Sequence, residues 1–231
     1  MATPKALFFD VFGTCVDWRS TVVREGAALG LPEAFADDWR GRYQPQLETV
    51  RSGERPWTVL DVLHREALDE VLAAHGADLA AEQRDTLNLV WHRLDPWPDT
   101  VPGLTRLKER FVIAPVSNGN IALLVDMARH AALPWDAILG AELARAYKPQ
   151  PEAYLRSAEA LGLAPGEAMM VAAHNSDLVA AAALGLMTAF VPRPREHGPG
   201  QTSDLRAEAA YDVVATDLVD LANALTAPIG P

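Results

Sequence analysis

Four polar stretches of the chain contain the residues most able to carry out chemistry. They are DVFGT at 10–14, SNG at 117–119, YKP at 147–149, and Asp177. A carboxylate such as Asp10 can act as a nucleophile, bind a metal or cap a helix, so taken singly it decides little. The chemistry becomes specific only if the fold brings these stretches to one place.

The strands expected before these stretches provide such a place. Residues 6–9 form an apolar run that leads into Asp10, and the run at 111–116 leads into Ser117. A third apolar run precedes the fourth stretch, and a loop rich in Pro and Gly is expected near the same edge at 193–201. Short apolar runs of this kind predict buried parallel strands. Ligands bind at the carboxyl edge of open α/β sheets, so we expect one shared site there.

Strands and helices alternate along the second half of the chain, which predicts an α/β fold. The expected architecture is a Rossmann-like, doubly wound parallel sheet covered on both faces. Residues 17–95 instead show only helical periodicity and form a helical insertion. We therefore expect a core domain of residues 1–16 and 96–231, interrupted by this insertion. Within it, Pro45 predicts a kink or break in a helix expected at 34–50.

The composition is that of an ordinary globular protein, with 49% apolar and 22% charged residues among 231. The net charge of −11 argues against nucleic acid or an anionic membrane as a partner. Residues 1–10 lack a basic stretch followed by a long apolar one, and we expect no signal peptide or membrane span. Cys15 is the only cysteine, which excludes an internal disulfide. We expect a cytoplasmic protein in which Cys15 is a buried, small apolar residue.

The four stretches, in this order, resemble the motifs of the haloacid dehalogenase superfamily. The resemblance covers essentially the whole chain, because the insertion at 17–95 resembles that family's cap domain. Most members are magnesium-dependent phosphatases. In these, an aspartate two residues after the nucleophile protonates the leaving group, and an acidic residue ahead of the final aspartate helps to hold magnesium.

The chain departs from the phosphatase pattern at both positions. Phe12 stands where the phosphatases have the second aspartate, and Ala172 and Ala173 stand ahead of Asp177. A phenylalanine cannot transfer a proton, which an alkoxide needs on leaving and a halide does not. Too few oxygen ligands remain to hold magnesium well. Both departures favour the family's type II (S)-2-haloacid dehalogenases, so we expect no metal and no cofactor.

The sequence DWRGRY at 38–43 resembles that subfamily's Trp-Arg segment, in which the arginine contacts the leaving halide. The resemblance implies that Arg40 is this arginine. An exposed ion pair is the alternative role for Arg40, and Arg42 is the alternative residue in another register. The expected pocket is narrow and suits haloacetates, with these aromatic walls: Phe12, Trp39 and Tyr43.

The implied reaction is a two-step displacement on a small anionic 2-haloacid, such as a haloacetate or an (S)-2-halopropionate. The Asp10 carboxylate attacks the carbon that bears the halogen and forms an ester, which water hydrolyses to an (R)-2-hydroxy acid. Lys148 is expected beside Asp10, where its cation favours the ionised carboxylate. Arg40 and Asn118 would stabilise the departing halide.

The same resemblance gives roles to further residues. Ser117 and the backbone N–H groups after Asp10 would hold the substrate carboxylate, and Asp177 would orient Lys148 or the hydrolytic water. Tyr154 matches a tyrosine in that subfamily's active-site region, and packing within a helix would explain this residue equally well. The complete set of these additional site residues is Thr14, Ser117, Val11, Phe12, Asn175, Tyr154 and Asp177.

The chain differs from better-known members at 172–174, where they carry Ser-Ser-Asn and this chain has AAH. His174 therefore replaces the asparagine that positions the hydrolytic water. Its imidazole, with an ordinary pKa of about 6.5, can orient that water or act as its base. A structural histidine bonded to a nearby backbone group is the alternative.

Two other functions are left open by the sequence. A magnesium-dependent phosphatase acting on a small phosphorylated metabolite would need an acid from outside the first motif. A binding protein that has lost the chemistry is disfavoured, because all four motifs retain their polar residues: Asp10, Ser117, Lys148 and Asp177. The resemblance also suggests a homodimer.

Overall fold

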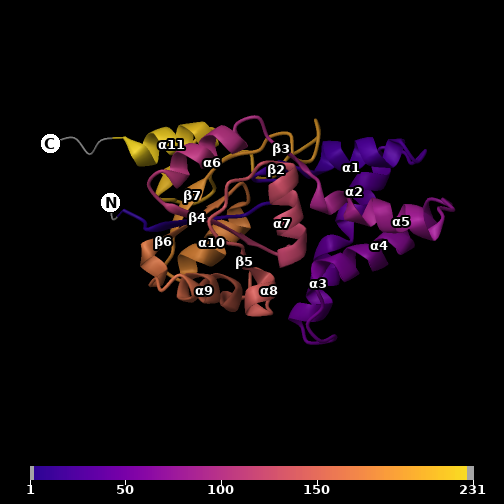
Figure 1. Cartoon of the computed structure of the whole chain (residues 1–231), viewed down its shortest axis with the longest axis horizontal. Helices are drawn as coiled ribbons and strands as arrows, with labels where there is room; N and C mark the ends of the chain where they lie inside the picture. The colour runs from indigo at the N-terminus through magenta and orange to yellow at the C-terminus, as the bar shows by residue number, and fades with distance from the viewer. Residues whose placement is uncertain (1–2, 228–231) are drawn as a thin grey trace.

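A six-stranded parallel sheet forms the centre of the molecule in a computed structural model (Figure 1). Its strand order is β5-β4-β1-β6-β7-β8, and every neighbouring pair is parallel. This confirms the predicted Rossmann-like α/β fold. The structure describes residues 3–227, so the ends of the predicted core domain at 1–2 and 228–231 lie outside the described residues.

The central strands are almost fully buried, because helices cover both faces of the sheet. In β1, Leu7 and Phe9 pack into one apolar layer while Ala6 and Phe8 pack into the other. A strand buried on both sides must be apolar throughout, which explains the unbroken apolar run before Asp10. The strands of this sheet are β1 Ala6–Phe9, β4 Val112–Ser117, β5 Leu139–Gly140, β6 Ala168–Ala172, β7 Met187–Phe190 and β8 Val213–Val214.

Two layers of helices enclose the sheet. The layer against Leu7 and Phe9 contains α6 Thr100–Lys108, α7 Ile121–His130 and α11 Leu218–Thr226. The layer against Phe8 contains α9 Pro151–Ala160 and α10 Asn175–Ala183. The short helices of this region are α8 Ala141–Ala144 and η2 Pro165–Glu167.

The helical insertion lies at one end of the molecule, away from most of the sheet (Figure 1). It is joined to the sheet region by a two-stranded antiparallel ladder of β2 (Val16–Asp17) and β3 (Asp95–Pro96). Both predicted domain boundaries fall on this ladder. The helices of the insertion are α1 Trp18–Ala27, α2 Ala34–Gly41, α3 Tyr43–Arg51, α4 Leu60–Ala74, α5 Ala81–Asn88 and η1 Leu89–His92.

The helix expected at 34–50 is two helices, α2 and α3, and the break lies at Arg42 rather than at Pro45. Pro45 lies in the first turn of α3. A proline is tolerated there because the N–H groups of a first turn have no partner within the helix. Arg40 therefore belongs to the last turn of α2, whereas Tyr43 begins α3.

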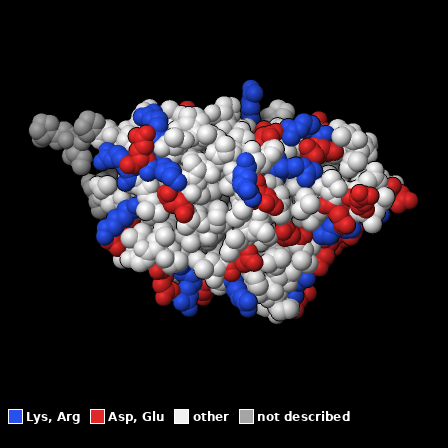
Figure 2. All heavy atoms as spheres, in the orientation of Figure 1, with Lys and Arg blue, Asp and Glu red and all other residues white. Residues whose placement is uncertain are grey.

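The surface carries charges of both signs. On the face shown in Figure 2, Lys and Arg side chains lie interspersed with Asp and Glu. Many of them form ion pairs, such as Arg55 with Glu66 and Lys108 with Asp136. Attraction for an anionic ligand must then come from cations inside a site, because the net charge of −11 repels it.

None of the helices within residues 3–227 is long and apolar enough to cross a membrane.

The close approach of α6 to α11 makes a first prediction. A Cβ on Gly103 would lie 2.6 Å from the backbone carbon of Leu218, so Gly103→Ala must push the two helices apart. We expect the free energy of unfolding to fall by about 1–3 kcal/mol, measured by urea denaturation. The matched control is Gly41→Ala, whose added Cβ meets no described atom within 4 Å. Equal destabilisation by both changes would contradict this account of the packing.

Candidate active site

A cavity of about 910 Å³ opens at the carboxyl edge of the sheet, where the helical insertion faces it. Two sets of residues line it, one from each region. The sheet region contributes Asp10, Phe12, Asn118, Lys148, Tyr154, His174, Asp177 and Glu196, and the insertion contributes Trp18, Arg40, Tyr43 and Arg51 among others. The structure thus brings the motifs from successive strand ends to one site.

Asp10 follows β1 and is held at both carboxylate oxygens. Its Oδ1 accepts a hydrogen bond from Lys148 Nζ at 2.9 Å. Its Oδ2 accepts one from Thr14 Oγ1 at 2.7 Å and lies 3.1 Å from His174 Nδ1. The Thr14 hydroxyl itself accepts a hydrogen bond from the backbone N–H of Ala173 at 2.9 Å. The carboxylate is therefore fixed in direction before any ligand arrives.

Charge explains why this buried carboxylate stays ionised. Burial alone raises the pKa of Asp10, but the Lys148 and His174 cations, with the Thr14 hydroxyl, hold that pKa well below its usual range. Burial likewise lowers the pKa of Lys148, but the carboxylates of Asp10 and Asp177 raise it above its usual value. At neutral pH the site therefore contains a carboxylate nucleophile beside an ammonium group.

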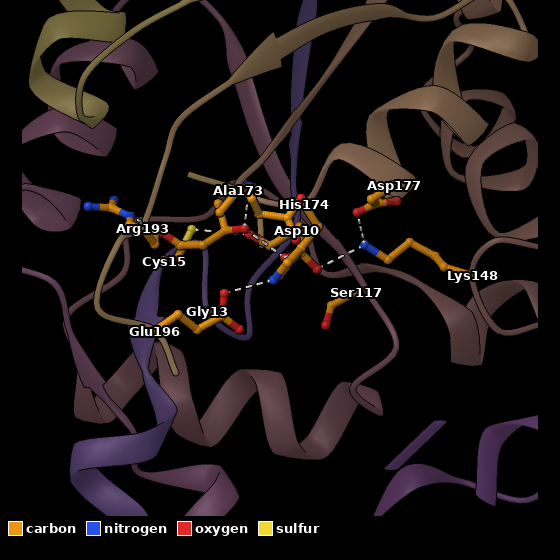
Figure 3. Close-up of polar contacts among 12 residues, drawn as sticks. Asp10, Gly13, Cys15, Ser117, Lys148, Ala173, His174, Asp177, Arg193 and Glu196 are labelled. Carbon is orange, nitrogen blue, oxygen red and sulfur yellow. Dashed lines mark hydrogen bonds and ion pairs between the residues drawn. The ribbon is translucent and has the colours of Figure 1, made fainter. Parts of the chain in front are cut away.

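Lys148 is positioned by contacts on three sides. Its Nζ also donates to Asp177 Oδ2 at 2.5 Å, and the Tyr154 hydroxyl donates to the other oxygen of Asp177 at 2.5 Å. The backbone N–H of Lys148 donates to Asn118 Oδ1 at 2.8 Å. Figure 3 shows the lysine reaching across the site, with its nitrogen between Asp10 and Asp177. Asp177 and Tyr154 thus act on Asp10 through the lysine.

His174 lies between two carboxylates rather than against a backbone group. Its Nδ1 faces Asp10, and its Nε2 lies 2.9 Å from Oε2 of Glu196. Glu196 is only 1% exposed, and its second oxygen accepts a hydrogen bond from Trp18 Nε1 at 3.0 Å. Burial lowers the pKa of His174, but Glu196 and Asp10 raise it well above its usual value. The ring is therefore an imidazolium at neutral pH.

Glu196 is the site residue that the sequence analysis did not find. It belongs to the 193–201 loop, which Arg193 anchors by donating to the Thr14 carbonyl at 2.8 Å. Gly13 makes room for it: the φ of Gly13 is +86°, and a Cβ there would lie 2.1 Å from Glu196 Oε1. Figure 3 shows the two residues side by side. Nothing local in the sequence relates this glycine to a glutamate so far along the chain.

The Arg40 guanidinium enters the cavity above aromatic rings. The distances from its Cζ to the ring centroids are 4.1 Å for Tyr43, 5.3 Å for Trp18 and 5.8 Å for Phe12. Its Nη1 is buried and has no hydrogen-bond partner among residues 3–227. The alternative, Arg42, is half exposed and lies 3.9 Å from Glu70. Arg40 is thus the arginine that can accommodate an anion in the cavity.

Asn118 and Ser117 are adjacent in sequence but lie differently. The Asn118 side chain lines the cavity and donates from Nδ2 to the Tyr43 hydroxyl at 2.9 Å. Ser117 is fully buried, and its Oγ accepts a hydrogen bond from the backbone N–H of Gly119 at 3.1 Å. Asn118 therefore shares the cavity with Arg40, whereas Ser117 stabilises the loop beneath it.

Three residues expected to bind substrate have side chains directed elsewhere. Trp39 lies inside the insertion, where its Nε1 donates to a backbone carbonyl of α4 at 3.0 Å, and Trp18 forms the cavity wall instead. Successive helical residues point about 100° apart, and here Arg40 faces the cavity while Trp39 faces the interior of the insertion. The Asn175 amide turns to the segment at 204–211, which includes Asp204 at 2.8 Å. The Val11 side chain packs in the hydrophobic core.

The only cysteine lies directly beneath the nucleophile. Cys15 is fully buried, as predicted, and its Sγ donates to the backbone carbonyl of Asp10 at 3.3 Å. Burial raises the pKa of this thiol far above its usual value. It is therefore a structural thiol rather than a nucleophile.

The donor set does not fit a magnesium phosphatase. The Phe12 ring occupies the wall where those enzymes have their second acid, and the alanines at 172–173 provide no carboxylate ahead of Asp177. Within residues 3–227, no cluster of three His, Cys, Asp or Glu side chains is suited to holding a metal ion.

Comparisons with known proteins identify the family of the chain. The family model described as haloacid dehalogenase-like hydrolase matches residues 4–185, so the chain belongs to that family. This confirms the predicted superfamily.

Three relatives illustrate the similarity. The (S)-2-haloacid dehalogenase of Xanthobacter autotrophicus is 30% identical, over 82% of this chain and 75% of its own. A crystal structure of a defluorinating L-2-haloacid dehalogenase is 51% identical with a TM-score of 0.93, covering 96% of this chain and 95% of its own. A second L-2-haloacid dehalogenase structure is 47% identical with a TM-score of 0.94, covering 97% of this chain and all of its own.

The contact between His174 and Glu196 makes a prediction about titration. Glu196→Gln removes a negative neighbour, so the pKa of His174 should fall, which NMR of the imidazole measures. In the native folded protein the pKa of His174 is raised above its ordinary value. The protonated ring therefore contributes stability that is fully present below the ordinary pKa and is lost as the pH rises through the pKa of the folded state. Between these two pH values, Glu196→Gln should lose less free energy of unfolding than the native protein loses. Glu208→Gln, a change of an exposed glutamate, is the control, and an unshifted His174 titration in Glu196→Gln would contradict the assignment.

Proposed function

We propose that the protein hydrolyses the carbon–halogen bond of small 2-haloacids and releases halide and a 2-hydroxy acid. The observation that carries this proposal is the pairing of two groups in one cavity. Ionised Asp10 is a nucleophile for carbon, and the buried Arg40 guanidinium has a free Nη1 that can bind a departing anion. The names of the three similar proteins given above, each a 2-haloacid dehalogenase, support the same reaction.

In the first step the Asp10 carboxylate attacks the carbon that bears the halogen. A C–O bond forms, and the carbon–halogen bond breaks with its electron pair on the halide. Arg40 and the Asn118 amide stabilise the negative charge that develops there. Lys148 keeps the Asp10 carboxylate ionised and oriented. A halide leaves without a proton, so Phe12 can occupy the position at which a phosphatase needs an acid.

In the second step His174 changes from an acid to a base. Ester formation removes the negative charge of Asp10, so the pKa of His174 falls and its Nδ1 releases a proton to solvent. Glu196 keeps the ring oriented through Nε2. Nδ1 then takes a proton from water as that water attacks the Asp10 carbonyl carbon.

Collapse of this intermediate breaks the ester C–O bond, with the electron pair going to the alkoxide. The alkoxide takes the second proton that came from water and leaves as the 2-hydroxy acid. Asp10 regains its carboxylate and His174 its positive charge, so the site returns to its starting state. The oxygen of the water stays in Asp10, and the product receives an oxygen from Asp10.

The remaining roles follow the resemblance to the type II dehalogenases. The helical insertion acts as a cap that carries Arg40 over the sheet edge. The backbone N–H groups of Val11 and Phe12 are the predicted contacts of the substrate carboxylate, whereas Ser117, which is buried and does not line the cavity, supports the loop that carries Asn118. The (S) preference, the cytoplasmic location and the homodimer stay predictions.

Halide release tests the proposal directly. Chloroacetate, fluoroacetate and both enantiomers of 2-chloropropionate are supplied with EDTA, and released halide is measured. We expect turnover by the native protein and a loss of about 10³-fold or more in Asp10→Asn. Arg40→Gln should lower kcat/KM by about 10²-fold, while Arg42→Gln, a change of a nearby surface arginine, leaves it unchanged. No halide, together with magnesium-dependent phosphate release from phosphoesters, would overturn the proposal.

The role of His174 predicts a trapped intermediate. His174→Ala retains the nucleophile but lacks the base, so ester hydrolysis should slow by about 10²–10⁴-fold. Chloroacetate should then give a burst of one halide per enzyme and a carboxymethyl group on the peptide that contains Asp10, detected by mass spectrometry. Hydrolysis of the ester at the native rate would remove His174 from the mechanism.

A further inference from the structure

A second ionic cluster, centred on the buried His92, joins the helical insertion to the sheet region and is separate from the groups that contact Asp10. His92 ends η1 and is only 8% exposed. Its Nε2 lies 3.0 Å from Oδ1 of Asp61, in the first turn of α4 of the insertion. Its Nδ1 lies 2.9 Å from Oδ2 of Asp126, on α7 of the sheet region. The imidazole therefore bridges the two regions.

Asp61 extends this bridge into the loop that carries Asn118. Its Oδ2 accepts a hydrogen bond from Asn120 Nδ2 at 2.8 Å, and its backbone N–H donates to Asn120 Oδ1 at 3.3 Å. Asn120 is buried and lies two residues after Asn118, at the start of α7. The Asn88 amide also donates to the Asp61 carbonyl at 3.1 Å. The first turn of α4 is thus tied to the strand-end loop at 117–120.

The contacts of His92 with two carboxylates depend on the charge of its ring. Burial lowers the pKa of His92, but Asp61 and Asp126 raise it above its usual value. Burial raises the pKa of Asp61, but His92 and Asn120 hold it below its usual range. Both ring nitrogens lie within hydrogen-bond distance of carboxylate oxygens, which only accept, so an imidazolium satisfies both contacts and a neutral ring could donate to only one of them.

The two donors proposed for the halide come from opposite sides of this bridge. Arg40 belongs to α2, which packs against α4 and is bonded to it through Trp39. Asn118 belongs to the loop after β4. The covalent connection between the regions is the narrow β2–β3 ladder, so noncovalent ties must fix how α2 sits over that loop.

We propose that His92, Asp61 and Asn120 form a positioning network that keeps Asn118 in register with Arg40 for binding one halide. This inference rests on the proposed function. Asp61 fixes the loop through Asn120, and His92 fixes Asp61 to α7. None of the three lines the cavity. The three residues set the distance between the two halide donors, the Arg40 guanidinium and the Asn118 amide.

The experiment compares variants of the network with a matched histidine–aspartate pair. His92→Gln and Asp61→Asn are nearly isosteric changes within the network. The control is His75→Gln at the other end of α4, where His75 Nε2 lies 2.8 Å from Asp38 Oδ2 within the insertion. Iodide affinity is measured by saturable quenching of tryptophan fluorescence, because Trp18 lies beside Arg40. The readouts are this affinity, kcat and KM for chloroacetate, and the NMR signal of the Asn118 side-chain amide.

We expect the network variants to weaken iodide binding about tenfold, to lower kcat, and to shift the Asn118 amide signal. His75→Gln should change none of these. A lower melting temperature alone, with native iodide affinity and an unshifted Asn118 signal, would show that the cluster only stabilises the fold and would overturn the inference. If His92→Gln does not fold, Asp61→Asn decides by the same readouts.

Failure of the proposed function gives a different result. In that case the native protein neither releases halide nor binds iodide saturably, and Arg40→Gln behaves like the native protein. The Asn118 amide signal then tests the positioning network alone: a shift in Asp61→Asn and not in His75→Gln supports it, and no shift overturns it.

Discussion

The structure depends on keeping one carboxylate ionised while it is buried. Asp10 needs cations on both sides because water cannot stabilise its charge, and Lys148 and His174 supply them. Each of those cations is buried in turn and needs a further carboxylate, which Asp177 and Glu196 provide. The result is a row of five groups whose charges alternate from one end to the other. Removing any member leaves its neighbours with an unbalanced buried charge.

The parallel sheet is what allows such a row to form. Its members come from the ends of β1 and β6, from the start of α10, from the segment before α9 and from the loop after β7. They are far apart in sequence and meet because parallel strands end at one edge. The helical insertion then adds Arg40 from the opposite side. In the proposed mechanism the sheet region therefore provides the nucleophile and the groups that balance its charge, and the insertion provides the cation for the leaving group.

The sequence predicts the groups that depend on local pattern and misses those that depend on side-chain direction or distant packing. Apolar runs indicate β1, β4, β6 and β7 because strands buried on both faces are almost entirely apolar. The resemblance identifies Asp10 and Lys148 because their motifs are contiguous. The prediction for Trp39 was wrong because one helical position turns its side chain about 100° away from that of Arg40. Glu196 was missed because its partner glycine is more than 180 residues away, and this contact exists only in the folded chain.

The burial of Cys15 has a consequence for an enzyme that handles 2-haloacids. Such acids alkylate free thiolates in solution, so an exposed cysteine would react with the substrate itself. The thiol of Cys15 is inaccessible and its raised pKa keeps it protonated, which removes the thiolate that reacts. The chain therefore keeps its one thiol out of reach, next to the carboxylate that the proposed mechanism alkylates. In that mechanism the alkylated group is Asp10, whose ester can be hydrolysed.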